Sequence, residues 1–71
     1  MIKFDVFGTL MSVLRNRDEW QLFVESETSI RRRVYDVVIP EELREDELAG
    51  YLDDIYHEYA SEKHPSVKQI S

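Results

Sequence analysis

The stretch IKFDVFGTLMSVLR, residues 2–15, decides the fold of this chain. Apolar and polar residues alternate on both sides of Gly8 and Thr9, and this period of two predicts a pair of antiparallel strands. Glycine at the first central position favours a two-residue type II′ turn, which would place Phe7 opposite Leu10. One face of the hairpin would then be apolar, with Ile2, Phe4, Val6, Met11 and Val13. The other face would be mixed, with Lys3, Asp5, Phe7, Leu10, Ser12 and Leu14.

A third strand is predicted at residues 20–25, after the polar break at residues 16–18. The length of this break continues the apolar face onto the third strand and leaves Phe23 on the mixed face. A slip of one residue would turn every side chain of the strand over, so this register is strongly favoured. The predicted pairs are Val13 with Leu22, Met11 with Val24, and Arg15 with Trp20.

The segment 30–39 is predicted to be a fourth strand that ends at Pro40. Its facing stays open, because apolar residues occur at both alternating sets of positions. We favour Tyr35, Val37 and Ile39 on the core side, since this arrangement leaves Asp36 in solvent.

A helix is predicted from Glu45 to about Lys63. Acidic residues near its start and Lys63 before Pro65 at its end are typical of helix termini. The segment 66–71 has no periodicity, and we expect it to be a flexible C-terminal tail. One half of the helical wheel is apolar and carries Leu48, Ala49, Tyr51, Leu52, Ile55, Tyr56, Tyr59 and Ala60.

These elements predict an α+β fold, in which a four-stranded antiparallel β-meander is packed on one face by a single C-terminal α-helix. Residues 1–65 would form one small domain. A chain of 71 residues buries only about 60% of the surface of its unfolded form, so association with another chain would add stability.

The net charge of −6 is carried by residues 41–71, where three cations face nine carboxylates. An acidic protein is repelled by phosphate backbones and by anionic lipid surfaces, so we expect neither nucleic acid nor a membrane as partner. The chain has no cysteine and no run of about 18 apolar residues. Its first residues also lack the order of a signal peptide, so we expect a cytoplasmic protein.

One helix covers only one face of a sheet, so Phe7, Leu10, Leu14 and Phe23 on the mixed face are expected to lie bare. Large apolar side chains without an internal partner usually mark an interaction surface. Gly50, which costs a helix about 1 kcal/mol relative to alanine, would allow close approach of another chain or is simply tolerated, and the second interpretation is favoured. We therefore expect a non-catalytic protein-interaction module, not an enzyme. It would associate through this bare face or an edge strand, with another protein or as a homodimer.

Two other kinds of site are conceivable from the residues present. Arg31, Arg32 and Arg33 would suit a small ligand or an anion, because guanidinium groups bind carboxylates and phosphates through paired hydrogen bonds. Charged residues also protect the edge of a sheet, and we favour this interpretation.

The second kind is a metal site at Asp53, Asp54 and His57, which lie within about one helical turn of each other. The zinc-protease motif needs a second histidine four residues after the first, and position 61 is a serine. We expect a solvated acidic helix face, with no metal, no cofactor and no catalytic residue.

Several stretches together resemble a family of short bacterial proteins that is known only as a domain of unknown function. The resemblance is carried by IKFDVFG at residues 2–8, WQLF at 20–23, VIP at 38–40, YLDDIYHEYA at 51–60 and HP at 64–65. It covers nearly the whole chain and implies a single domain. The family lends no catalytic residues.

Overall fold

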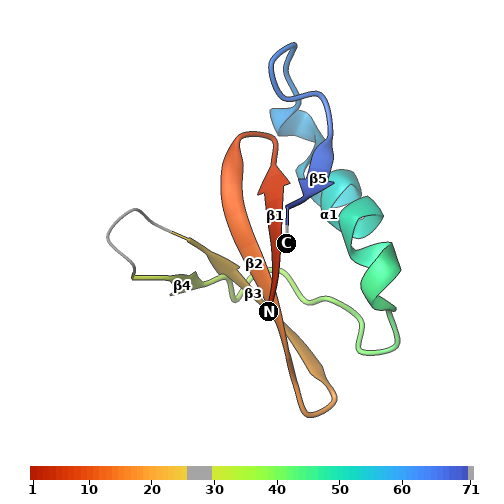
Figure 1. Cartoon of the computed structure of the whole chain (residues 1–71). Coiled ribbons are helices and arrows are strands. Elements are labelled where there is room, and N and C mark those ends of the chain that lie inside the picture. The colour runs from red at the N-terminus through yellow and green to blue at the C-terminus, as the bar shows by residue number, and fades with distance from the viewer. Residues whose placement is uncertain (26–29, 71) are drawn as a thin grey trace.

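The computed structural model describes residues 1–25 and 30–70, which form a five-stranded antiparallel sheet and one helical segment. The strands lie in the order β4-β3-β2-β1-β5, and α1 lies at the β5 end of the sheet (Figure 1). The predicted α+β architecture is confirmed, with one more strand than expected. The strands are β1 (Ile2–Val6), β2 (Thr9–Asn16), β3 (Glu19–Val24), β4 (Arg32–Arg33) and β5 (Val67–Gln69).

The turn between β1 and β2 is centred on Phe7 and Gly8, one residue earlier than predicted. Their φ angles are 49° and 92°, the positive values of a type I′ turn. The Gly8 N–H donates a hydrogen bond of 2.8 Å to Asp5 Oδ1. The register therefore differs from the prediction by two residues, and Phe4 pairs with Met11. A shift of two keeps the two faces of the hairpin, but it moves Phe7 into the turn.

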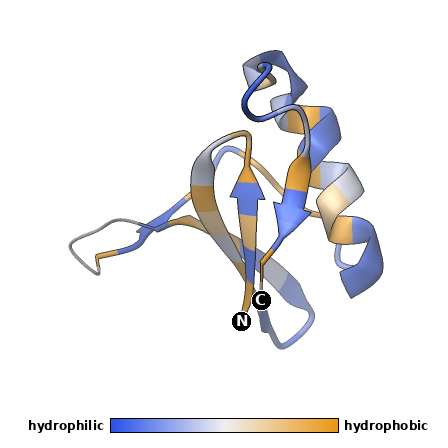
Figure 2. Ribbon diagram, turned by 45° about the horizontal axis from the view of Figure 1, so that its top comes forward, coloured by the Kyte–Doolittle hydropathy of each residue, from blue (hydrophilic) through white to orange (hydrophobic). Residues whose placement is uncertain are grey.

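The register of β2 with β3 is confirmed, including the pairs of Val13 with Leu22 and Arg15 with Trp20. Its strength comes from the alternation on both strands, which buries one complete set of side chains. The largest buried side chains come from the inner face of the sheet and from the helix, and they include Phe4, Leu22, Leu48 and Leu52. Figure 2 shows the resulting alternation of apolar and polar bands along the strands.

The fourth strand is much shorter than the predicted segment 30–39, because only Arg32 and Arg33 are assigned to β4. The Val34 N–H donates to the Leu22 carbonyl, so Val34 lies on the inner face. Tyr35 therefore points away from the core and is 79% exposed, which corrects the predicted facing. After Val34 the chain is no longer a strand, so the alternation stops, and Val37 and Ile39 still reach the core.

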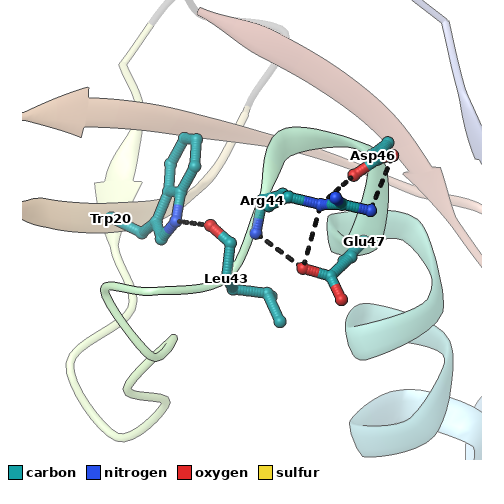
Figure 3. Close-up of polar contacts among 5 residues, drawn as sticks. All are labelled: Trp20, Leu43, Arg44, Asp46 and Glu47. Carbon is teal, nitrogen blue, oxygen red and sulfur yellow. Dashed lines mark hydrogen bonds and ion pairs between the residues drawn. The ribbon is translucent and has the colours of Figure 1, made fainter.

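Residues 34–44, here called the crossing segment, carry the chain from β4 across the inner side of the sheet to the helix (Figure 1). Side chains of regular elements donate hydrogen bonds to its carbonyl groups. Trp20 Nε1 donates to the Leu43 carbonyl at 2.9 Å (Figure 3). Arg15 and Tyr51 donate in the same way to the carbonyls of Glu41 and Val38, at 2.8 Å and 2.9 Å. These bonds hold an irregular segment in a fixed place.

The helical segment begins with a 3-10 turn, η1 (Glu45–Glu47), continues as α1 (Leu48–Tyr56) and ends with a second 3-10 turn, η2 (His57–Tyr59). At its start, a carboxylate oxygen of Glu47 accepts a hydrogen bond of 2.8 Å from the Arg44 N–H (Figure 3). Ala60 is extended, so the helix ends before the predicted Lys63. No helix within residues 1–25 and 30–70 is long and apolar enough to cross a membrane.

The prediction of a flexible C-terminal tail was wrong, because residues 67–69 form β5, which pairs with β1. Val67 lies opposite Val6, and Gln69 lies opposite Phe4. The hydrogen bond from the Ile70 N–H to the Lys3 carbonyl continues this ladder. Three residues are too few to show a period of two, so the pattern alone could not identify them as a strand.

The two glycines of the chain should respond in opposite ways to alanine. Gly8 has a φ of 92°, and an added Cβ would lie 3.0 Å from His64 Cδ2, so Gly8→Ala should lower the free energy of unfolding by about 1–2 kcal/mol. Nothing lies within 4 Å of a Cβ added at Gly50, so Gly50→Ala should raise it by up to about 1 kcal/mol. Urea unfolding followed by circular dichroism measures both. Equal effects of the two substitutions would contradict the turn described here.

Trp20→Phe should lower the free energy of unfolding by about 1–2 kcal/mol, because it leaves a partly buried Leu43 carbonyl without its indole donor. Tyr51→Phe is the matched control, since its hydrogen bond to Val38 is exposed and water replaces the lost hydroxyl. The control should cost clearly less in the same unfolding measurement. A larger loss for Tyr51→Phe would mean that the indole bond does not anchor the crossing segment.

Candidate functional site on the outer face of the sheet

The sheet has a second side, opposite the helix and the crossing segment, which we call the outer face. The pairings of all five strands identify its members. No helix or strand of the described residues covers it. Its members are Lys3, Asp5, Leu10, Ser12, Leu14, Glu19, Gln21, Phe23, Glu25, Arg31, Arg33, Lys68 and Ile70.

Phe23 is the centre of an ionic cluster on the outer face. The guanidinium carbons of Arg31 and Arg33 lie 5.7 Å and 6.0 Å from the centroid of its ring. Both cations also have carboxylate partners. Arg31 Nε lies 3.0 Å from Glu25 Oε2, and Arg33 Nη2 lies 2.7 Å from Glu19 Oε1. Each arginine is thus held by one carboxylate and by the Phe23 ring, and the guanidinium carbon of Arg33 also lies 5.1 Å from the ring centroid of Tyr35.

A row of paired residues crosses the outer face and contains two buried polar atoms without a hydrogen-bond partner. The row runs from Lys3 through Ser12 and Phe23 to Arg33. Ser12 is 0% exposed, and neither its Oγ nor Arg33 Nε has a hydrogen-bond partner among the described residues. A buried polar atom in this state costs stability, so this row is the least satisfied part of the sheet.

The apolar members of the outer face are only partly those that the sequence predicted. Leu10 is 40% exposed, and Leu14 and Phe23 are half-buried, as part of an uncovered face. Phe7 is a correction: its ring is 7% exposed and packs edge-on against His57, with 6.0 Å between the ring centroids. The turn removes Phe7 from the alternation of β1 and points it at the end of the helix.

Ile70 is an apolar member of the outer face that the sequence did not predict. It is 55% exposed and lies beside Lys3 on the outer face. Sequence reasoning missed Ile70 because β5, the strand before it, has only three residues and shows no period of two. Gly50 lies in α1, which packs on the inner face, so the structure does not bring it together with the other candidate interface residues.

The three arginines of the candidate anion site are divided between the two faces. Arg32 pairs with Val24 and so lies on the inner side, whereas Arg31 and Arg33 lie on the outer face. The two outer arginines are already bound to carboxylates. This arrangement favours stabilisation of the sheet edge over binding of an anion, which stays an untested prediction.

The residues of the candidate metal site are partly together. His57 Nδ1 lies 3.1 Å from Asp53 Oδ1, while the side chain of Asp54 is exposed and takes part in no hydrogen bond or ion pair within the described chain. The second histidine of the chain, His64, lies elsewhere, beside Gly8 and with its Nδ1 4.0 Å from Asp5 Oδ2. The described residues contain no group of three or more His, Cys, Asp or Glu side chains that could hold a metal ion.

One family model matches residues 1–71, and its description is "Domain of unknown function (DUF7661)". The chain belongs to this family. The resemblance noted in the sequence, to a short domain of unknown function that spans the chain, is thereby confirmed. Among curated proteins and among solved structures, the comparisons found no match. The family description assigns no function, so any functional conclusion has to come from the surfaces of the molecule.

Ser12→Ala should raise the free energy of unfolding by about 1 kcal/mol, because it removes a buried hydroxyl that has no hydrogen-bond partner. Ser61→Ala is the matched serine control. Ser61 Oγ accepts a hydrogen bond of 3.2 Å from the His64 N–H, so its loss should lower stability slightly. Chemical denaturation of both variants tests the opposite signs. A destabilised Ser12→Ala variant would show that the hydroxyl has a partner in solution.

Proposed function

We propose that this chain is a small, non-catalytic interaction module, and that its outer face binds a second copy of the chain. The observation that carries the proposal is the uncovered set of Leu10, Leu14, Phe23 and Ile70 on one side of the sheet. Apolar side chains of this kind gain stability when another surface removes them from water. A small domain gains in particular, because its own core is limited.

The charges of the outer face support a second copy as the occupant. The whole chain has a net charge of −6, so two copies repel each other over most of their surfaces. The outer face is different, because its cations slightly outnumber its carboxylates. A face that carries both signs and an apolar centre can also pair with itself about a two-fold axis. Its cations are Lys3, Arg31, Arg33 and Lys68, and its carboxylates are Asp5, Glu19 and Glu25.

The edges of the sheet are less suited to association with another chain than its outer face is. The edge strands β4 and β5 have two and three residues, so each presents few free backbone groups to another strand. Short edge strands are a common means by which proteins prevent edge-to-edge pairing. Of the two routes of association expected from the sequence, the structure therefore favours face-to-face contact.

Sedimentation velocity over a wide range of protein concentration tests this proposal. We expect a concentration-dependent dimer that is lost in a Leu10→Lys, Ile70→Lys double variant, because four added charges would meet at the interface of the dimer. Both positions are exposed, so the variant should still fold, as circular dichroism can verify.

Val38→Lys serves as the matched control. Val38 is 79% exposed and lies in the crossing segment, away from the outer face, so its dimerisation should equal that of the unchanged chain. A chain that stays monomeric at every concentration would refute the proposal. So would a dimer that survives the double substitution.

A further inference from the structure

A groove of about 370 Å³ lies between the turn of the first hairpin and the C-terminal end of the helix. The strands contribute Val6, Met11 and Val24 from the inner face, and the helical segment contributes Tyr56 and Tyr59. Its volume is in the usual range for pockets that hold small ligands, roughly 300–1,000 Å³. The groove is separate from the outer face, because its strand residues point to the opposite side of the sheet.

The groove has an apolar floor and an aromatic rim. Val6, Phe7 and Met11 line it and are 3%, 7% and 3% exposed, whereas Tyr59 is 62% exposed. The rings of Tyr56 and Tyr59 are 6.3 Å apart between centroids and tilted by 41°. Two adjacent rings at an accessible rim present π-faces, and such faces attract cations.

A helix terminus and a carboxylate place negative charge near this rim. α1 ends at Tyr56 and η2 ends at Tyr59, so the carbonyl end of the helical segment, with its partial negative charge, lies beside the groove. Burial raises the pKa of the Tyr56 hydroxyl, and the nearby carboxylate of Asp36 raises it further. Asp36 therefore lies close enough to act on the rim, and a bound cation would feel its attraction.

Arg32 is the group that would favour the opposite charge. It pairs with Val24 and so lies on the same side of the sheet as the groove. It is exposed and has no ion pair within residues 1–25 and 30–70. Arg32 could therefore attract an anion to the groove, and an anionic probe is needed to test this alternative.

We propose that the groove binds an organic cation, with an alkylammonium group on the rings of Tyr56 and Tyr59 and an apolar part over the floor formed by Val6, Phe7 and Met11. The same chemistry is found in small quaternary amines and in a lysine side chain with methylated nitrogen. Both sources share a cation with a weakly hydrated surface, which an aromatic rim binds better than water does.

Three probes of nearly the same shape separate charge from apolar contact. Choline is the cation, 3,3-dimethylbutan-1-ol is its neutral analogue, and 3,3-dimethylbutanoate is an anion of similar size. Each is titrated into the ¹⁵N-labelled full chain, and amide shifts are followed by NMR. Choline should shift the amides of Phe7, Tyr56 and Tyr59 with weak, saturable affinity. The neutral probe should bind at least about ten-fold more weakly, a difference of about 1.4 kcal/mol.

Variants assign the effect to the rim. Tyr59→Leu should reduce choline affinity several-fold, whereas Tyr59→Phe should keep it, because the ring and not the hydroxyl attracts the cation. Asp36→Asn should also weaken binding. Tyr35→Leu is the matched control: Tyr35 is 79% exposed and its ring lies 5.1 Å from the guanidinium carbon of Arg33 on the outer face, so its replacement should change nothing.

A peptide with one trimethyl-lysine distinguishes the two sources of the cation. Tighter binding of the peptide than of choline would identify a protein segment as the ligand, and equal or weaker binding would identify a small amine. Either result supports the proposal. It is overturned if the anion binds better than choline, if the neutral probe binds equally well, or if choline shifts none of these amides.

Discussion

The backbone of the crossing segment imposes the constraint on which the rest of this structure depends. The chain has to pass from β4 at one edge of the sheet to α1 near the other, and it does so without a regular ladder of hydrogen bonds. The partly buried carbonyl of Leu43 would lose its water without compensation there. Trp20, Arg15 and Tyr51 supply donors instead, so β2, β3 and α1 are connected through one irregular strip of chain.

The two sides of the sheet differ because of this route. The helix and the crossing segment both pack on the inner side, where Ile39, Leu48 and Leu52 complete the core. Nothing comparable is left in the described chain for the outer side, which keeps its mixture of apolar and charged side chains. The two candidate binding surfaces follow from the same division. One is the outer face, on which no helix packs. The other is the groove on the inner side, beside the end of the helical segment at Tyr59.

Most of the architecture could be predicted wherever a long alternation and a buried face agree. The pairing of β2 with β3 is an example, because a slip would have exposed Leu22.

Prediction failed where the local geometry of the backbone overrode the alternation of side chains. Glycine at the first central position favoured a turn at Gly8 and Thr9. The structure instead has a positive φ at Phe7, which is unfavourable for a bulky residue, and the burial of the Phe7 ring against His57 offsets that cost. β5 has three residues and becomes visible only through its partner β1. The outer face was therefore predicted with Phe7 in place of Ile70.

The pairing of β1 with β5 has a consequence for how the chain is made. β1 is a central strand in the finished sheet, yet its partner on one side lies almost at the other end of the described sequence. During synthesis, β1 and β2 emerge before β5, and one edge of β1 stays open until β5 has left the ribosome. An open strand edge is a template for pairing with other chains. The nascent protein thus stays open to edge pairing at β1 until β5 has emerged.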